Sequence, residues 1–559
     1  MRPFQKMDSV LAATGTATTS DKAGLLLLCA ALATAGPLFV VTYLPFTDMP
    51  EHVAVMATLR HWFDPAWRIQ EHYVLALRSQ YALYHLAGAL LTALVGDAER
   101  ANRLLMAASA ICLPFALRSL LRAFGRDERI ALLACPLFWS RPLVIGFLPY
   151  MASLPLMLYT LAAATRQHQQ ASTRRAVWLA VLTVLLFYLH ASAFALLGVI
   201  TVALALVHAV RVRTISLRHL ALHLGWLIPS GVCAVTWWIL GRMTLNASSL
   251  SDPGEIGHMA PMRLARAISL WSHDIWVDHV DEMLALAYWC VFATILIAGM
   301  WKRRGEFTPC TDFLPLLPFA CALAVYFVIP FRIGAGAMLN VRLAPVLALF
   351  ALVALPPLPR KNRALEIALA AGFFIAIATP ANAARVVLAA EREEANGIDE
   401  ALAVTRPGAR LVELSFDMRS RYQHFPPWVH LGAYHRARKG GVSSYSFTEL
   451  HHWSLHFVKA NAPPKKSHAF WEFDPCLFRN AQDGQYYDYV LVRGRLDPFR
   501  DHPPGPAWKV SVHKGDFTLY EKVSDETYPT WATADLGPCR DRSESEAAKP
   551  AKPAMEIEK

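Results

Sequence analysis

Hydrophobic and polar positions alternate in long blocks over most of the chain. The apolar runs are about 16–22 residues long, the length that a helix needs to cross about 30 Å of hydrocarbon. We place about eleven such spans in the sequence, at roughly 23–44, 100–117, 130–147, 148–165, 176–190, 191–210, 220–241, 283–301, 313–330, 340–357 and 364–383. The pattern predicts a polytopic α-helical membrane protein.

Basic residues in the short loops test this assignment. Arginine and lysine cluster in every second loop, and the intervening loops are mostly poor in them, with clusters at 118–129, 166–175, 211–218, 302–304 and 360–363. By the positive-inside rule these clusters are cytoplasmic. The run 81–96 is too short for a span and would reverse the pattern, so we interpret it as a helix at the membrane surface or re-entering the membrane.

This topology divides the chain into four parts. Residues 1–21 form a cytoplasmic N-terminal segment, and 22–384 form the transmembrane domain with a first outer loop at 45–99. From 385 the composition is that of a soluble protein: 392–404 predicts a helix, and 409–416, 487–494 and 508–523 predict strands. An odd number of spans places this α/β domain, 385–540, outside the cytoplasm, where Cys476 and Cys539 could form a disulfide. The tail 541–559 is charged and predicted to be disordered.

Composition agrees with a membrane protein. Of 559 residues, 55% are hydrophobic and only 17% are charged, which is less charge than a soluble protein of this size carries. The net charge of +11 is explained by the basic loops, and no nucleic-acid-binding motif is present. The nine cysteines include no CxxC pair, so the sequence does not support a zinc or redox motif.

An acidic group follows the first span directly. In "PFTDMPEHVA" (45–54), Asp48, Glu51 and His52 are spaced i, i+3 and i+4 and share one face of a helix. Asp-x-Pro-Glu is also a good helix start, with Asp48 as N-cap, Pro50 in the first turn and Glu51 closing a capping box. Local sequence leaves both readings open.

The order of several motifs resembles the GT-C superfamily of integral-membrane glycosyltransferases. "PFTDMPEHVA" is similar to the acidic motif that opens their first outer loop, and three further stretches are similar to later segments of uncharacterised bacterial multipass members: "IGFLPYMASLPLMLYTLAAATR" (145–166), "YLHASAFALLGV" (188–199) and "FRIGAGAMLNVRLAPVLALF" (331–350). The resemblance implies a sugar donor linked to a polyprenyl phosphate or diphosphate. It also implies a bacterial inner membrane, with the C-terminal domain in the periplasm.

Sugar transfer from a lipid phosphate needs few groups. A carboxylate deprotonates the acceptor hydroxyl, and Asp48 is our first choice for this base, with Glu51 second. The leaving phosphate needs positive charge or hydrogen-bond donors, for which the candidates are Arg342, Arg332, His190 and His52. Snorkelling of the arginines to the interface and burial of His190 explain the same residues equally well.

A divalent cation is a further possibility. The chain lacks the Asp-Glu or Asp-x-Asp dipeptide of better-known GT-C families, which puts metal dependence in doubt. The segment "LWSHDIWVDHVDEM" (270–283) offers Asp274, Asp278 and His279 as candidate ligands. An amphipathic segment at the membrane interface explains these residues too.

The sequence thus predicts a glycosyltransferase that acts at the outer face of the membrane on an unknown glycan, lipid or protein acceptor. Two alternatives remain at this stage, a transporter or flippase of lipid-linked or envelope substrates and a non-catalytic envelope assembly protein. Transporters usually carry acidic residues within their spans, and here the spans are poor in aspartate and glutamate. Chemistry at the membrane surface is therefore favoured.

Overall fold

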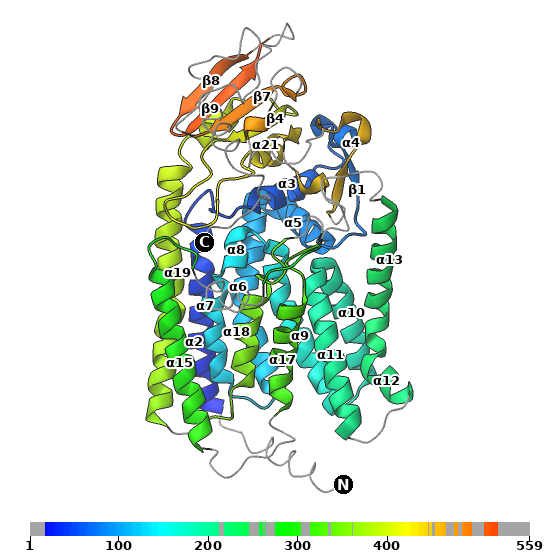
Figure 1. The fold of residues 1–559 in the computed structure, drawn as a ribbon, viewed down its shortest axis with the longest axis vertical. Coiled ribbons are helices and arrows are strands. Elements are labelled where there is room, and N and C mark those ends of the chain that lie inside the picture. The colour runs from blue at the N-terminus through cyan, green and yellow to red at the C-terminus, as the bar shows by residue number, and fades with distance from the viewer. Residues whose placement is uncertain are drawn as a thin grey trace.

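The computed structural model has a helical bundle with an α/β region at one end (Figure 1). It describes residues 17–211, 217–244, 256–260, 263, 274–302, 313–333, 337–359, 362–444, 446–449, 453–464, 475–478, 483–494 and 508–523. The end of the bundle next to the α/β region is called the domain side below.

Long apolar helices build the bundle. They are α2 (Ala17–Ala35), α6 (Ala98–Ala123), α9 (Leu148–Gln169), α10 (Thr173–Leu189), α11 (Ala191–Arg211), α13 (Ile228–Thr244), α15 (Val280–Lys302), α17 (Leu317–Val328), α18 (Leu343–Ala354) and α19 (Arg363–Glu394). In the described part of the chain, seven helical stretches are long and apolar enough to cross a membrane. The membrane-protein class is thereby supported, and the finer count of about eleven spans stays a prediction.

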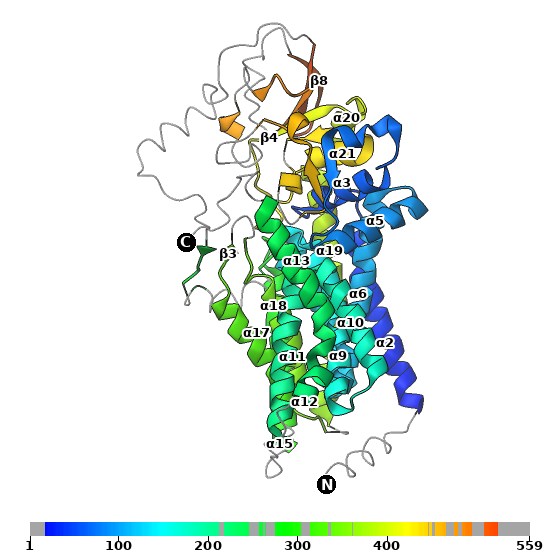
Figure 2. The same ribbon diagram turned by 90° about the vertical axis from the view of Figure 1, so that its right-hand side faces the viewer.

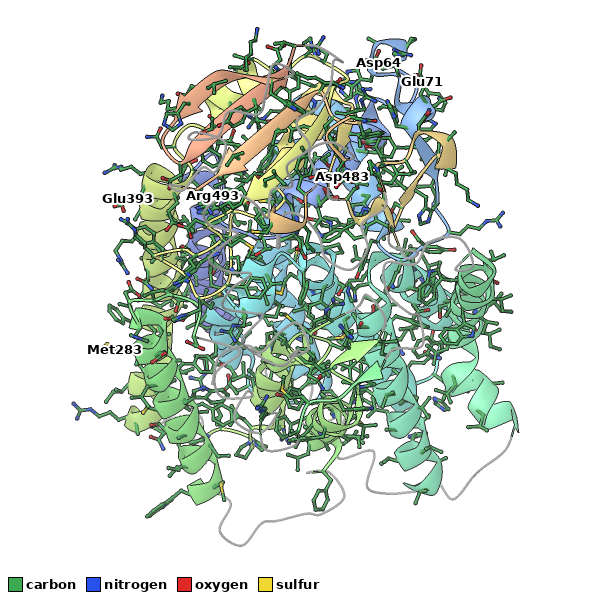
Figure 3. All side chains as sticks on the ribbon, turned by 45° about the horizontal axis from the view of Figure 1, so that its top comes forward. Asp64, Glu71, Met283, Glu393, Asp483 and Arg493 are labelled. Carbon is green, nitrogen blue, oxygen red and sulfur yellow. The ribbon has the colours of Figure 1, made fainter. Side chains whose placement is uncertain are left out.

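Apolar side chains cover the outside of the bundle. Met283 on α15 is 72% exposed and points away from the helices (Figure 3), and α13 and α19 present the exposed side chains of Val232 and Phe374. A water-soluble protein would bury such residues, whereas lipid tails solvate them.

The predicted single helix over 130–147 is wrong. This segment forms three short helices, η3 (Glu128–Leu133), α7 (Ala134–Phe138) and α8 (Arg141–Ile145). Pro142 lies in the first turn of α8, where it is tolerated, and Gly146 ends α8 with a φ of +95°. The hydropathy of this segment resembles a span, but its proline and glycine break the helix and leave a turn on the domain side.

The short run after the first outer loop forms α5 (Ala82–Val95), which has 14 residues. A helix of this length rises about 21 Å, too little for a span. Leu90 and Leu94 are 70% and 81% exposed, so one face of α5 is apolar and open. This geometry agrees with the predicted position at the membrane surface.

The α/β region is built on a five-stranded sheet of order β5-β4-β7-β9-β8. β4 (Arg410–Ser415) pairs in parallel with β5 (Val442–Ser443) and β7 (Tyr489–Arg493), and the hairpin of β8 (Trp508–Lys514) and β9 (Phe517–Lys522) adds to β7 antiparallel. β4, β7, β8 and β9 fall in the three predicted strand segments, whereas β5 was not predicted.

The predicted helix over 392–404 is divided. α19 runs through to Glu394 and α20 spans Ile398–Ala403, because Gly397 has a φ of +107° and lies against the Lys514 carbonyl. Cys476 is disulfide-bonded. Its predicted partner Cys539 lies outside the described residues.

The first outer loop and the α/β region pack together on the domain side (Figures 1 and 2). β1 (Tyr73–Leu75) pairs antiparallel with β6 (Leu455–Phe457), and α21 (Gly432–Lys439) packs along α3 (Met49–Arg60). At the other end of the bundle, Arg166 donates to the Ser119 carbonyl and Arg118 pairs with Glu128. Two of the predicted cytoplasmic clusters therefore share one end, opposite the α/β region.

Candidate active site

Asp48 lies at the start of α3, where the chain turns after its first span. Residues 43–58 are all described, and every one of them except Asp48 is buried. Its carboxylate makes no cap hydrogen bond to α3, and the Glu51 carboxylate is used elsewhere, so the capping-box reading is wrong. Asp48, whose side chain is 17% exposed, is therefore the one partly exposed residue of this buried segment.

The turn that ends α8 holds the backbone of Asp48. The amides of Thr47 and Asp48 donate to the carbonyls of Val144 and Ile145, at 3.1 and 3.2 Å. A Cβ added to Gly146 would lie 2.5 Å from the Asp48 nitrogen and 2.7 Å from its Cβ. Glycine is required here both by its positive φ and by this close approach.

Gly146→Ala is expected to lower the melting temperature of the purified protein, because alanine is strained at this φ and clashes with the Asp48 backbone. Differential scanning fluorimetry in detergent measures the shift. Gly198→Ala is the matched control, since Gly198 lies inside α11 with no atom within 4 Å of the added Cβ. An equal melting temperature for Gly146→Ala and wild type would contradict the close packing.

Burial raises the pKa of Asp48 to about 7, although His430 and Arg342 oppose this rise by their positive charge and Glu51 adds to it. The Nε2 atom of His430 lies 3.7 Å from Asp48 Oδ1. A carboxyl group that titrates near neutral pH is suited to act as a general base.

Arg342 provides the positive charge next to Asp48. It is the residue before α18, is 8% exposed, and its guanidinium carbon lies 4.2 Å from the centre of the Phe147 ring. Its NH1 atom is 3.4 Å from His190 Nε2, and its buried Nε has no hydrogen-bond partner among the described residues. Gly146 touches Asp48 while Phe147 stacks on Arg342, so these two neighbouring residues fix Asp48 and Arg342 relative to one another.

His190 faces the same guanidinium and is 1% exposed. Its Nδ1 accepts the amide hydrogen of Ser192, so a neutral ring carries its proton on Nε2, toward Arg342. Two neighbouring donors such as these fit a shared acceptor, for example a phosphate oxygen. The structure thus brings together two of the four predicted phosphate-binding residues.

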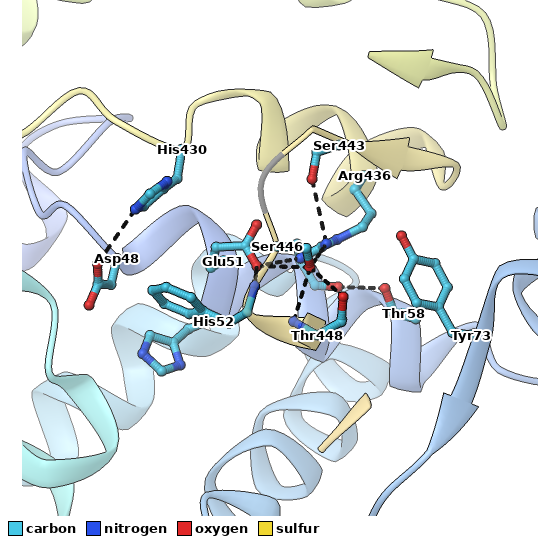
Figure 4. Close-up of polar contacts among 12 residues, drawn as sticks. Asp48, Glu51, His52, Thr58, Tyr73, His430, Arg436, Ser443, Ser446 and Thr448 are labelled. Atoms are coloured by element: carbon cyan, nitrogen blue, oxygen red, sulfur yellow. Dashed lines mark hydrogen bonds and ion pairs between the residues drawn. The ribbon is translucent and has the colours of Figure 1, made fainter. Parts of the chain in front are cut away.

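Glu51 lies in a buried ion pair (Figure 4). Arg436 of α21 donates to Glu51 Oε2 at 2.9 Å, and the Phe447 amide donates to the same oxygen at 3.0 Å. The side chains of Glu51 and Arg436 are 0% and 1% exposed. These contacts join α3 to the α/β region and occupy the carboxylate that we predicted as the second choice for the base.

His52 lies on the other side of α3, within an aromatic cluster. Its Nδ1 is 3.1 Å from His85 Nε2, and His85 Nδ1 is 2.9 Å from the Ser454 hydroxyl. Burial lowers the pKa of His52 to about 3, against a hydrogen bond to the backbone of Gly146 that raises it. A neutral imidazole in this place orients the Gly146 turn and offers no positive charge to an anion.

Arg332 and the candidate metal ligands contact residues other than Asp48 and Arg342. Arg332 is in β3 (Arg332–Ile333), which pairs antiparallel with β2 (Ile256–Gly257). Asp274 pairs with Arg141, Asp278 with Arg385, and His279 with Glu282. Among the described residues, no three histidine, cysteine, aspartate or glutamate side chains gather as a metal site.

Sequence reasoning missed His430, Arg436 and Gly146. The first two come from the α/β region and gain their meaning only from contacts with α3, so no local pattern marks them. Gly146 could have been identified from the sequence, because it lies in the motif "IGFLPYM" on which the family resemblance rests. That resemblance gave it no role.

No protein-family model and no curated protein matches the chain. Among solved structures, the arabinofuranosyltransferase AftD from Mycobacteria is similar with a TM-score of 0.53 and 17% identity, over 90% of this chain and 40% of AftD. ArnT from Cupriavidus metallidurans bound to undecaprenyl phosphate gives a TM-score of 0.52 and 13% identity, over 92% of this chain and 100% of ArnT. Apo ArnT gives a TM-score of 0.54 and 12% identity over the same shares.

At these identities the likeness shows the fold. The chain shares the fold of these solved structures, in agreement with the membrane-helical fold predicted from the sequence. The chain spans well under half of AftD and all of ArnT.

Proposed function

We propose that this protein transfers a sugar from a polyprenyl-phosphate carrier to an acceptor hydroxyl on the domain side of the membrane. One observation carries the proposal. Asp48, an accessible acid with a pKa of about 7, lies within electrostatic reach of the buried Arg342, which begins a helix lining an apolar cavity in the bundle. In this proposal Asp48 is the base, Arg342 binds the anion, and the apolar cavity binds the lipid tail.

The transfer step uses Asp48 as general base. The Asp48 carboxylate takes the proton of the acceptor hydroxyl as its oxygen forms a bond to the anomeric carbon of the sugar. The bond from that carbon to the phosphate oxygen breaks, and the polyprenyl phosphate leaves with the electron pair. A single displacement of this kind inverts the anomeric configuration.

Arg342 and His190 hold the phosphate in this proposal. Within the part of the chain that the structure describes, the Nε of the guanidinium is buried without a hydrogen-bond partner, and the neighbouring imidazole directs its proton toward the same guanidinium. Charge-assisted hydrogen bonds of this kind are about twice as strong as neutral ones. The N-terminus of α18 adds its helix dipole to the same place.

An apolar cavity lies along α18, the helix that Arg342 precedes. It has a volume of about 360 Å³ and lies between α15, α17 and α18, where Ala344, Leu347 and Ala351 line its α18 side. Because Arg342 immediately precedes α18, we infer that an isoprenoid chain attached to a phosphate at Arg342 runs along α18 to this cavity.

The solved neighbours agree with this donor class. ArnT was captured with undecaprenyl phosphate, and AftD is an arabinofuranosyltransferase. By the positive-inside rule, the arginine-rich end of the bundle is cytoplasmic, and the α/β region is extracytoplasmic, in the periplasm of a bacterial inner membrane. A disulfide at Cys476 fits that compartment.

Turnover by the purified wild-type protein in nanodiscs tests the proposal. The protein is mixed with polyprenyl-phosphate-linked hexoses and pentoses and with extracts of envelope glycans and lipids, and release of polyprenyl phosphate is followed by mass spectrometry. Release that depends on acceptor supports a transferase. Movement of the intact carrier between leaflets without cleavage would instead identify a flippase, and no effect on any carrier would favour an assembly role.

Arg342→Gln is expected to weaken binding of undecaprenyl phosphate about ten- to a hundredfold, because a charged hydrogen-bond donor is lost. Fluorescence quenching in nanodiscs measures the affinity. Arg100→Gln is the matched control, since Arg100 also follows the first outer loop but is 72% exposed. Equal affinities for wild type and Arg342→Gln would remove Arg342 from the phosphate site.

A further inference from the structure

The α/β region covers the start of α3 at three points. Gln423 Nε2 donates to the Pro45 carbonyl at 3.1 Å, and the Thr47 hydroxyl donates to the Pro426 carbonyl at 2.7 Å. The third point is His430, whose Nε2 is 3.7 Å from Asp48 Oδ1 (Figure 4). The segment 423–430 therefore packs along the segment 45–48, and its last residue, His430, faces Asp48.

The backbone at His430 is shaped for this contact. His430 has a φ of +69°, a conformation that glycine adopts without cost and most other residues avoid. It directly precedes the N-cap of α21, Leu431, so the turn and the helix together set the direction of the imidazole. A strained residue next to an active-site acid points to a functional constraint.

The imidazole is enclosed on its other sides. His430 is 2% exposed, and its ring packs edge-to-face on Phe447 at 5.6 Å. Phe447 follows the serine that contacts Glu51, so the ion pair between Glu51 and Arg436 and the position of His430 depend on the same segment of the α/β region.

The charged and titratable groups that face Asp48 come from four elements. His430 comes from the α/β region, Arg342 from the start of α18, Glu51 from α3 itself and Tyr81 from the start of α5. Glu51 is neutralised by Arg436, and Arg342 is assigned above to the phosphate. His430, which is charged only when protonated, is then the remaining group of positive charge that faces Asp48.

We propose that His430 is a positioning residue of the active site, supplied by the α/β region, which orients Asp48 and favours its carboxylate form. This rests on the proposed role of Asp48 as the base. The α/β region is therefore a component of the catalytic centre and not only a surface for an acceptor.

His430→Asn tests the proposal, because asparagine tolerates the left-handed backbone but carries no positive charge. Loss of a cation about 4 Å from a carboxylate moves its titration up by about one pH unit. The acidic limb of the pH–kcat profile is then expected to move to higher pH by that amount. At pH 7 the rate falls about fivefold, at pH 9 it is nearly that of wild type, and KM for the lipid donor does not change.

A readout without turnover separates this proposal from the proposed function. Infrared difference spectra of the protein in nanodiscs, with Asp48→Asn to identify the Asp48 carboxyl band, give the titration of Asp48 in wild type and in His430→Asn. A shift of the band to higher pH supports the pairing even if no carrier is turned over, in which case only the proposed function fails. An unshifted band overturns the role of His430, whatever the activity.

His513→Asn is the control for substitution of a histidine in the same region. His513 is exposed on β8, in the outer hairpin of the sheet (Figure 1). Its loss is expected to leave the carboxyl titration and the pH–kcat profile as in wild type. A fall in kcat that is equal at every pH in His430→Asn would mean a purely structural role and would also overturn the proposal.

Discussion

Asp48→Asn is expected to reduce sugar transfer by about three orders of magnitude, within the range that general-base catalysis contributes. Asparagine has nearly the same shape, and the Asp48 side chain makes no cap hydrogen bond to α3, so the start of α3 is preserved. Because its amide cannot take a proton at neutral pH, only the base is removed. Transfer rates with a saturating lipid donor, measured beside the melting temperature, separate loss of chemistry from loss of fold.

Asp64→Asn is the matched control for this prediction. Asp64 lies in the same outer loop, caps the short helix η2 (Pro65–Trp67) and is 38% exposed in a pair with His61. We expect activity within twofold of wild type for this variant. Wild-type rates for Asp48→Asn would show that Asp48 is not the base, and the binding experiments on Arg342 would then have to be explained by a lipid-binding role alone.

Much of the fold follows from hydropathy because the solvent of the bundle is lipid. Long apolar runs have few structural alternatives when every backbone polar group must be satisfied within the segment. The segment 130–147 is the instructive exception: its composition is apolar, but Pro142 lies in the first turn of a new helix and Gly146 ends that helix, which an average of hydropathy does not detect. The break is also what creates the turn under Asp48.

The candidate site was predictable only in its local parts. Asp48 and Arg342 carry local signals, an acid directly after a span and an arginine inside an apolar run. The contacts of His430 and Arg436 with α3 join residues that are almost four hundred positions apart. Such pairs have no signature in a single sequence, since either residue alone resembles an ordinary polar residue of a soluble domain.

Glu51→Ala is expected to destabilise the protein by about 3–5 kcal/mol, because Arg436 is left buried without its counterion. The α/β region is then held to α3 less firmly, so a protease added from the domain side is expected to cleave it faster. Thermal unfolding and timed proteolysis measure the two effects. Glu71→Ala is the control, since Glu71 pairs with Arg68 at the surface and such pairs contribute about 0–1 kcal/mol.

The double variant Glu51→Ala/Arg436→Met decides between the two roles open to Glu51. Replacing both members of a buried ion pair by apolar residues is often nearly neutral for stability, whereas removing one member is not. If Glu51 only joins α3 to the α/β region, the double variant regains most of its stability, and transfer activity returns with it. If stability returns while activity stays absent, Glu51 takes part in the chemistry, and the assignment of the base to Asp48 alone is incorrect.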